Sequence, residues 1–183
     1  MNNVSFTGKA ALISGGASGI GLATAQRLIA QGATVWIADI QDTLGQQIAE
    51  EIGANYLHLD VAKEEEWTSA VELIAGQGQG LHLLMNNAGI AIGGTLETQT
   101  TAEFLQTINI NLLGVFLGCK VCAPLLALSG GGSIVNVSSI WGMVSDPGAV
   151  AYSASKGGVR TMTKAIALDL ADRKTHIRAN SIH

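Results

Sequence analysis

Apolar residues in this 183-residue chain gather in short, nearly continuous runs, and longer stretches with helically spaced apolar positions separate these runs. Short continuous runs are typical of strands buried on both faces of a parallel sheet, and the stretches between them predict the helices that cover it. We expect strands at 9–14, 33–39, 55–61, 81–87, 132–138 and 176–182. We expect helices at 20–31, 42–52, 64–77, 101–128 and 151–171, with a kink or break at Pro124 in the fourth of them.

This alternation of strand and helix predicts an α/β fold, with a Rossmann-like, doubly wound parallel sheet and helices on both faces. The six strands are expected in the order 3-2-1-4-5-6, which reverses between the first and the fourth strand. Ligands of such sheets bind at the carboxyl ends of the strands, at this reversal. Because no repeat, linker or low-complexity segment divides the sequence, residues 1–183 are expected to form a single domain.

Composition and charge narrow the possible partners. Hydrophobic residues make up 48% of the chain and charged residues 13%, and the net charge of −4 arises without a long run of either sign. This argues against the basic surface of a protein that binds nucleic acid or an anionic membrane. The start of the sequence lacks the pattern of a secretory signal, and no stretch reaches the ~18 apolar residues of a membrane span. We therefore expect a soluble cytoplasmic protein with no nucleic-acid or membrane partner.

Cys119 and Cys122 form a C-x-x-C pattern inside the apolar run at 101–128. A metal or redox site of this pattern would need further ligands, and the sequence has no second cysteine pair and no nearby histidine. We therefore expect both cysteines to be buried structural residues and the protein to bind no metal.

The glycine-rich segment SGGASGIG, from Ser14 to Gly21, joins the first expected strand to the first expected helix. Glycines let the backbone approach a pyrophosphate, and free N–H groups at the start of a helix attract its charge. The phosphate loop of NTPases is unlike this segment, because Leu22 and Ala23 replace the required Lys-Ser/Thr. The segment therefore predicts dinucleotide binding, although a turn that only joins strand to helix has the same composition.

Asp39 lies at the end of the second expected strand. A carboxylate at this position can accept hydrogen bonds from ribose hydroxyls and would repel a 2′-phosphate. No cation that could hold such a phosphate is present at Ala17, Ser18 or Ile40. The pattern therefore favours NAD over NADP, and the alternative for Asp39 is a solvated acid at a strand end.

The segment YSASK places Tyr152 and Lys156 four residues apart in the last expected helix, hence on one face and about 6 Å apart along its axis. A tyrosine is a weak base at neutral pH and needs a nearby cation to accept a proton. An ammonium group at ~4–5 Å, with an effective dielectric of about 20, stabilises a phenolate by roughly 3–4 kcal/mol. The spacing therefore indicates a general acid/base pair, and the small residues between the two leave room for a ligand.

Five short motifs occur in order along the chain, and together they resemble the classical short-chain dehydrogenases/reductases over essentially its whole length. They are G-x-x-x-G-x-G at Gly15, Gly19 and Gly21, NNAG at 86–89, Asn111 in NLLGVF, NVSS ending at Ser139, and YSASK at 152–156. The resemblance implies a dinucleotide-binding and catalytic domain that interconverts a secondary alcohol and a ketone by hydride transfer. It implies NAD as the cofactor and Tyr152 as the general acid/base.

The resemblance also implies the roles of individual residues. Ser139 would orient the substrate oxygen, Lys156 would also hold the nicotinamide ribose, and Asn111, with Asn109 as its competitor, would complete a proton relay through water. The residues expected to bind the cofactor are Gly15, Ser18, Gly19, Ile20, Gly21, Asp39, Asp60, Val61, Asn87, Ala88, Gly89, Tyr152 and Lys156. For Asp60 and Val61 a plain strand-end turn is the alternative. The substrate is expected to contact Ser139, Trp141 and Tyr152.

The substrate and the assembly are less closely defined by the sequence. Five apolar residues follow the strands of the site and would form a wall for a hydrophobic alcohol or ketone, such as a cyclic alcohol or a steroid-like ketone, or else belong to the covered core. They are Ile90, Ile140, Trp141, Met143 and Val144. The resemblance implies a homodimer or homotetramer joined through the long helices at 101–128 and 151–171. Family members continue past the sixth strand with a substrate-lid region that this sequence lacks. The alternative function is therefore a catalytically inactive NAD-binding or oligomerisation module.

Overall fold

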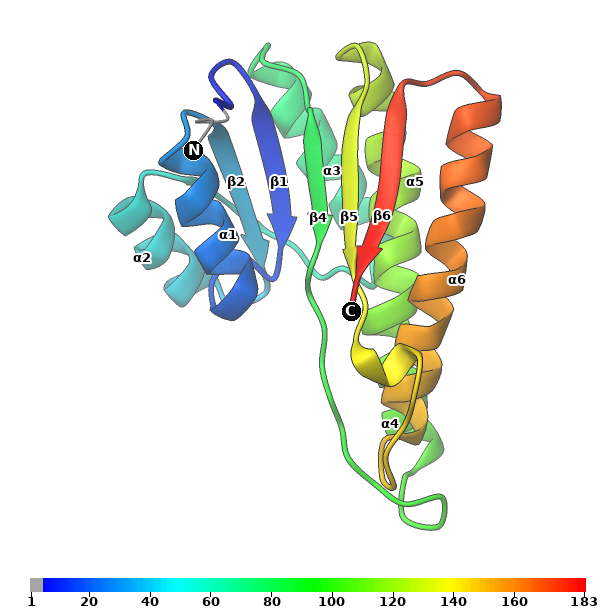
Figure 1. Ribbon diagram of the computed structural model, residues 1–183. Coiled ribbons are helices and arrows are strands. Elements are labelled where there is room, and N and C mark those ends of the chain that lie inside the picture. The colour runs from blue at the N-terminus through cyan, green and yellow to red at the C-terminus, as the bar shows by residue number, and fades with distance from the viewer. Residues whose placement is uncertain (1–4) are drawn as a thin grey trace.

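The computed structural model describes residues 5–183, which build a six-stranded parallel sheet with helices on both faces (Figure 1). The strand order β3-β2-β1-β4-β5-β6 confirms the predicted Rossmann-like α/β fold. The strands are β1 (Ala10–Ser14), β2 (Thr34–Asp39), β3 (Asn55–His58), β4 (Leu83–Asn86), β5 (Gly132–Val137) and β6 (Ile177–Ile182). The helices are α1 (Gly19–Ile29), α2 (Asp42–Ile52), α3 (Glu64–Gly76), α4 (Thr101–Ile108), α5 (Gly114–Leu128) and α6 (Val150–Asp172), with a π-helical turn η1 (Asn109–Leu113) and a 3₁₀ turn η2 (Ile140–Gly142).

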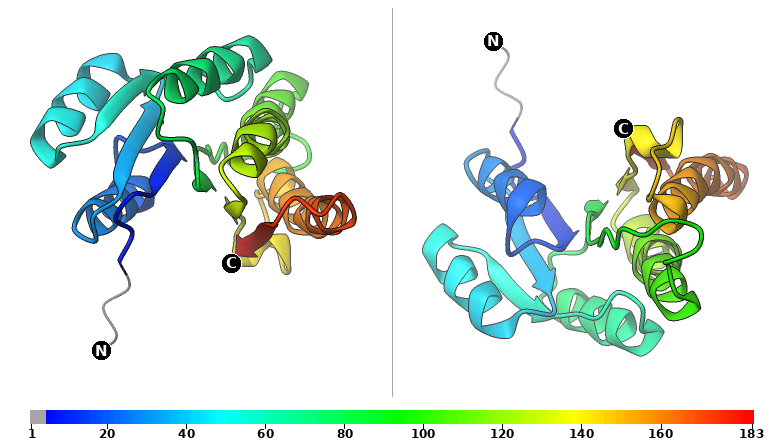
Figure 2. Two further views of the ribbon diagram at one scale, coloured as in Figure 1. Left: turned by 90° about the horizontal axis from the view of Figure 1, so that it is seen from above. Right: turned by 90° about the horizontal axis from the view of Figure 1, so that it is seen from below.

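Two apolar clusters hold the sheet between two layers of helices. Because successive side chains of a strand point to opposite faces, Leu12 of β1 joins one cluster and its neighbours Ala11 and Ile13 join the other. Helices α1 and α2 cover the face of Ile13, and α3, α5 and α6 cover the face of Leu12 (Figure 2). Burial on both faces explains why these strands appear in the sequence as continuous apolar runs.

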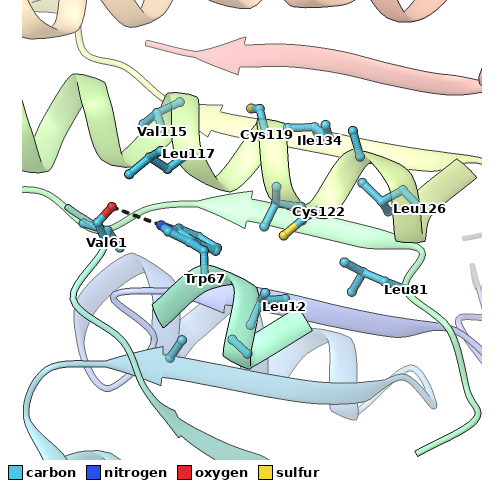
Figure 3. Close-up of a cluster of buried hydrophobic side chains, with 14 of the residues drawn as sticks. Leu12, Val61, Trp67, Leu81, Val115, Leu117, Cys119, Cys122, Leu126 and Ile134 are labelled. Carbon is cyan, nitrogen blue, oxygen red and sulfur yellow. Dashed lines mark hydrogen bonds between the residues drawn. The ribbon is translucent and has the colours of Figure 1, made fainter. Parts of the chain in front are cut away.

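Trp67 of α3 anchors the larger cluster near the end of β3 (Figure 3). Its side chain is fully buried, and its indole Nε1–H donates to the carbonyl oxygen of Val61 at 3.0 Å. Gly114, the first residue of α5, packs against the side chain of Val61, where a Cβ would approach to 2.8 Å. Val61, which the sequence places in the cofactor site, is therefore held at a fixed position after β3.

The helix expected at 101–128 is a helical run of three parts. Helix α4 leads into η1, where the backbone widens to π geometry, and α5 continues through Pro124 to Leu128. This corrects the expected break at Pro124, because the irregularity lies at η1, a kind of turn that is frequent at functional sites. By length and composition alone this run could cross a membrane, but 56% of its most apolar window is buried inside the fold.

Cys119 and Cys122 of α5 are both free and buried, which confirms the structural interpretation of the C-x-x-C pattern. Burial raises the pKa of the Cys119 thiol to about 11 and also raises the pKa of Cys122, so both stay protonated at neutral pH. Within residues 5–183 no cluster of histidine, cysteine and acidic side chains is arranged to hold a metal ion.

Three strands end earlier than the apolar runs predict. Strand β3 ends at His58, β4 at Asn86 and β5 at Val137. The residues after them leave the sheet and form loops at its carboxyl edge, which faces downward in Figure 1, with α4 lying beyond it. These loops carry several of the residues that the sequence assigns to the site, so the candidate site is built at this edge.

Candidate active site

The segment between β1 and α1 turns sharply at the carboxyl edge of the sheet. Gly15 and Gly19 have φ angles of 62° and 53°, in the region that favours glycine. At Gly21 a Cβ would lie 2.7 Å from Nδ2 of Asn87, so the start of α1 packs directly on the strand ends. The residues at 18–20 are exposed, and no side chain caps the first turn of α1. Its backbone N–H groups can therefore bind an anionic ligand.

Asn87 ties the loop after β4 to the end of β1. Its Nδ2 donates to the carbonyl oxygens of Ser14, at 3.1 Å, and Gly15, at 2.9 Å. In return Oγ of Ser14 accepts from the backbone N–H of Asn87 at 3.1 Å and of Ala88 at 3.3 Å. These bonds fix the two loops at the point where the strand order reverses.

Asp39, at the end of β2, is 8% exposed and joins this strand to the glycine-rich segment. Its Oδ2 accepts from the backbone N–H of Ala17 at 3.3 Å, and its Oδ1 accepts from that of Gln41 at 3.2 Å. Asp39 lines a cleft at the carboxyl edge of the sheet. The cleft brings together six of the predicted cofactor residues, namely Gly15, Asp39, Asp60, Val61, Ala88 and Gly89.

Asp60 forms a turn directly after β3. Its Oδ1 accepts from the backbone N–H of Ala62 at 3.0 Å, and its own N–H donates to Oε2 of Glu66 at 2.6 Å. Lys63 pairs with both acids, at 3.6 Å from Asp60 and 2.8 Å from Glu66. The residue is therefore part of a strand-end turn and, at the same time, part of the wall of the cleft.

Tyr152 and Lys156 lie close together on α6. The amine nitrogen of Lys156 is 5.7 Å from the centroid of the Tyr152 ring. Tyr152 is half-buried, and its ring meets Trp141 edge to face at a centroid distance of 5.8 Å and an interplanar angle of 87°. The phenol is therefore neither sealed in the core nor turned away from the amine.

The amine of Lys156 is buried behind the cleft. It donates to the carbonyl oxygen of Val137 at 2.7 Å, and the residue is 4% exposed. Loss of hydration lowers the pKa of this amine from 10.5 to about 8. A Cβ at Gly89 would lie 3.5 Å from the amine nitrogen and 3.2 Å from Oδ1 of Asn111. A larger residue at position 89 would therefore crowd the space between the cleft and the amine.

We expect the stability of the ligand-free protein to depend on pH through Lys156. Because its pKa is about 8 in the fold and 10.5 in solution, the unfolded chain binds more protons between these values, and stability rises with pH. Relative to Lys156→Met, the wild type should gain up to about 3 kcal/mol of unfolding free energy across this window. Chemical denaturation of both proteins at several pH values measures this gain. The other titrating groups are common to the two proteins, so their contributions cancel in the difference. A difference that stays constant or shrinks as the pH rises would contradict the lowered pKa.

Asn111, in η1, is fully buried and faces the loop after β4. Its Oδ1 accepts from the backbone N–H of Ile90 at 2.8 Å, and its Nδ2 donates to the carbonyl oxygen of Ile90 at 2.8 Å and to Oγ of Ser155 at 3.1 Å. Oγ of Ser155 donates in turn to the carbonyl oxygen of Tyr152 at 2.7 Å. Asn109 is exposed, so it is Asn111 that the fold brings next to α6.

Ser139 begins η2 directly after β5, and its Oγ accepts from the backbone N–H of Trp141 at 3.2 Å. Four apolar residues of the following loop are exposed, which excludes the alternative that they belong to the covered core. They are Ile140 (54%), Trp141 (37%), Met143 (46%) and Val144 (59%). The loop therefore presents an apolar surface beside Tyr152.

Comparison with known proteins places this arrangement in a family. The model of the family described as short chain dehydrogenase matches residues 9–183. The chain belongs to this family. As a short-chain dehydrogenase it is an oxidoreductase that acts on alcohols or ketones with a nicotinamide cofactor.

Several curated short-chain dehydrogenases are similar to nearly the whole chain. The cyclopentanol dehydrogenase of Comamonas sp. is 43% identical over 180 residues, 96% of this chain and 71% of that protein. The 3-alpha-(or 20-beta)-hydroxysteroid dehydrogenase of Mycobacterium bovis is 42% identical over 178 residues, 96% of this chain and 68% of that protein. The NADP-dependent (R)-specific alcohol dehydrogenase of Lentilactobacillus kefiri is 38% identical over 181 residues, 96% of this chain and 72% of that protein.

The residues of this short-chain dehydrogenase fit a nicotinamide dinucleotide. The exposed first turn of α1 offers N–H groups to a pyrophosphate, and Asp39 offers acceptors to a ribose. Ala88 and Gly89 are small residues that line the cleft, and Gly89 lies next to the amine of Lys156.

Two serines of this short-chain dehydrogenase, Ser138 and Ser155, have contacts in the site that the sequence did not predict. The small residues between Tyr152 and Lys156 are expected only to leave room, yet Ser155 is fully buried and holds both Asn111 and the carbonyl of Tyr152. Oγ of Ser138 donates to the carbonyl oxygen of Lys156 at 2.8 Å, which fixes α6 against the end of β5. In the sequence Ser138 is marked by its place at a strand end and within the NVSS motif, neither of which indicates this contact.

Proposed function

We propose that the protein is an NAD(H)-dependent dehydrogenase that interconverts a secondary alcohol and a ketone, with Tyr152 as the general acid/base. The observation that carries this proposal is the amine of Lys156, 5.7 Å from the Tyr152 ring and directly behind a cleft built from six predicted cofactor residues. A base next to a buried cation, close to a nucleotide cleft, is suited to remove the hydroxyl proton of an alcohol while a hydride leaves the carbon that bears this hydroxyl.

Each residue of the site has a distinct part in this reaction. Tyr152 takes the hydroxyl proton when an alcohol is oxidised and returns it when a ketone is reduced. The bound nicotinamide supplies the hydride acceptor or donor. Ser139 donates a hydrogen bond to the substrate oxygen and orients it, and the ammonium group of Lys156 stabilises negative charge on the Tyr152 oxygen. Asn111 acts from η1, where it holds the loop after β4 against α6.

The cofactor residues are assigned from their resemblance to the family motifs, and six of them also line the cleft. Gly15, Ser18, Gly19, Ile20 and Gly21 would hold the pyrophosphate, and Asp60 and Val61 would flank the adenine. Asn87, Ala88 and Gly89 would face the nicotinamide half, Lys156 would hold its ribose, and Tyr152 would lie beside it.

NAD is proposed over NADP because of Asp39. The carboxylate is held by two backbone N–H groups and faces the cleft, where it would repel a 2′-phosphate. One relative is NADP-dependent by name, so the preference of this chain must come from its own residues.

Replacing Asp39 by alanine is expected to lower the preference for NAD. The loss of hydrogen bonds from ribose hydroxyls to a charged acceptor should raise KM for NAD by about 10- to 100-fold, with a smaller change for NADP. Steady-state kinetics with both cofactors measure the ratio. Glu50→Ala, at an exposed acid of α2, is the matched control and should leave the ratio unchanged. An unchanged ratio in Asp39→Ala would remove Asp39 from cofactor selection.

A hydrophobic substrate is proposed from the apolar surface beside Tyr152. Trp141, Met143 and Val144 are exposed there, and burying them against a substrate would stabilise the complex. Two similar proteins are named for cyclopentanol and for hydroxysteroids, which are cyclic secondary alcohols. We infer the same class of substrate for this chain.

We also propose a soluble cytoplasmic homodimer or homotetramer joined through α4, α5 and α6. Support comes from exposed apolar side chains on these helices, namely Leu105 (51%), Phe116 (43%) and Leu168 (73%). Light scattering of the purified protein measures the assembly, and a monomer would contradict this part of the proposal.

The test of the proposed function is turnover. The protein is mixed with NAD or NADP and a panel of open-chain and cyclic secondary alcohols, and NADH or NADPH formation is followed in the near ultraviolet. We expect NADH formation that is fastest with hydrophobic cyclic alcohols. Quenching of NADH fluorescence without turnover of any alcohol or ketone would identify the alternative, an inactive NAD-binding or oligomerisation module.

A further inference from the structure

Helix α6 begins two residues before Tyr152 without a capping side chain of its own. Its N-cap residue is Ala149, whose methyl group cannot accept a hydrogen bond, and its first turn contains no acidic residue. The first N–H groups of a helix have no partner within the helix and need acceptors from elsewhere. Ala151 is fully buried, so bulk water does not reach its N–H.

Gln99 supplies the acceptor from a distant part of the chain. Its Oε1 accepts from the backbone N–H of Ala151 at 3.2 Å, across 52 residues of sequence. Its Nε2 donates to the carbonyl oxygen of Ile92 at 3.1 Å. One amide group therefore joins the first turn of α6 to the loop that follows β4.

The backbone of Gln99 is fixed on both sides. Its N–H donates to the carbonyl oxygen of Thr95 at 2.9 Å, which closes a turn just before it. The next residue, Thr100, begins α4 with a capping box in which it and Glu103 bond each other's backbone N–H groups. Gly94 packs on the same turn, where a Cβ would lie 3.0 Å from that of Gln99. The backbone from which the Gln99 side chain extends therefore has a well-defined position.

A second contact joins the same two loops close by. The backbone N–H of Gly94 donates to the carbonyl oxygen of Gly148 at 3.0 Å, and Gly94 pairs with Ala149 as a parallel bridge. The loop after β4 and the loop before α6 are thus held together at two places. These loops carry Ile90, which lines the cleft, and Trp141, which contacts the ring of Tyr152.

We propose that Gln99 is a positioning residue, which sets the place of Tyr152 relative to the loop after β4 by capping α6 and holding Ile92. This inference rests on the proposed function. The acceptor at Ala151 fixes the first turn of α6, and with it the phenol one residue later. The donor to Ile92 fixes the loop that faces the substrate.

The two halves of the Gln99 amide predict separable effects on catalysis. A displacement of about 1 Å at a reacting group can lower the rate by 10²-fold, so a loosened first turn should lower kcat. Lys156 lies one turn further along and has its own anchors, Ser138 at its carbonyl and Val137 at its amine. Cofactor binding should therefore stay unchanged, whereas a loosened loop after β4 should raise KM for the alcohol.

Two variants test these effects. Gln99→Met removes both bonds at similar volume, and we expect kcat to fall about tenfold, KM for the alcohol to rise several-fold and the Kd for NADH to stay within about twofold. Gln99→Glu keeps an acceptor for Ala151, favourable at a helix start, but places an oxygen against the carbonyl of Ile92. It should restore kcat to within about twofold of wild type while KM stays raised. Gln106→Met, at an exposed glutamine of α4, is the matched control.

The outcomes separate this inference from the proposed function. If the wild type forms no NADH from any alcohol, the proposed function fails, and the inference fails with it. If the wild type turns over and Gln99→Met keeps its kcat, the inference alone is wrong. Equal loss of kcat in both Gln99 variants, or weaker NADH binding in parallel with kcat, would reduce Gln99 to a general structural residue. Should Gln99→Met not fold, KM for the alcohol in Gln99→Glu decides: a raised KM with kcat near that of wild type supports the inference, and an unchanged KM overturns it.

Discussion

Replacing Tyr152 by phenylalanine is expected to lower kcat about 10³-fold and to leave the Kd for NADH within about twofold of wild type. The substitution removes one oxygen and keeps the ring, so the edge-to-face contact with Trp141 is retained. Without the hydroxyl no group of the site can exchange a proton with the substrate oxygen in the same geometry. Steady-state kinetics measure kcat, and NADH fluorescence titration measures Kd.

The chain provides its own control, because it has one other tyrosine. The hydroxyl of Tyr56, in β3 at the sheet edge opposite β6, lies 2.7 Å from the carbonyl oxygen of Asp39 and 2.7 Å from Oδ1 of Asp42. Tyr56→Phe should cost about 1 kcal/mol of stability and leave kcat nearly unchanged. Residual turnover of a tenth or more in Tyr152→Phe would show that another group carries the proton.

The sheet could be predicted from the sequence because the burial of a strand on both faces leaves a pattern within the residues of that strand. Parallel strands buried on both faces, such as β1 with Leu12 on one side and Ile13 on the other, must be apolar throughout, and this leaves continuous runs in the sequence. The pairing of Tyr152 with Lys156 was equally accessible, because helix geometry alone places residues four apart on one face.

The remaining features of the site depend on contacts between distant segments. Gln99 meets Ala151 only because α4 packs beside α6, and no period in the sequence encodes a contact across 52 residues. Ser155 looks like a spacer in the sequence, and its hydrogen bond to another segment forms only because η1 brings Asn111 next to it. The turn η1 contains no glycine or proline that would mark it in the sequence, whereas Pro124, a residue type that often ends helices, lies within the continuous helix α5.

Replacing Lys156 by methionine is expected to lower kcat by about 10²- to 10³-fold, the rate equivalent of the roughly 3–4 kcal/mol that a nearby ammonium contributes to a phenolate. It should also raise the Kd for NADH about tenfold, because a charge-assisted hydrogen bond to the ribose is lost. Tyr152→Phe leaves this Kd unchanged, so the two variants separate proton transfer from cofactor binding. Lys164→Met, an exposed lysine of the same helix, is the matched control.

Lys156→Met and Lys156→Arg together test whether the effect of Lys156 on kcat comes from its charge or from its packing in the fold. Burial of the ammonium is costly, as its pKa of about 8 indicates, so the methionine variant should lack the gain in stability above pH 8 that is expected of the wild type. Lys156→Arg keeps the positive charge, but its planar guanidinium group replaces a compact amine in the space between Val137 and Gly89. We therefore expect its kcat to stay at least about tenfold below that of the wild type. If the arginine variant were fully active, charge alone would suffice. If Lys156→Met kept its turnover, the buried amine would be structural, and the proton chemistry proposed for Tyr152 would lose its source of stabilisation.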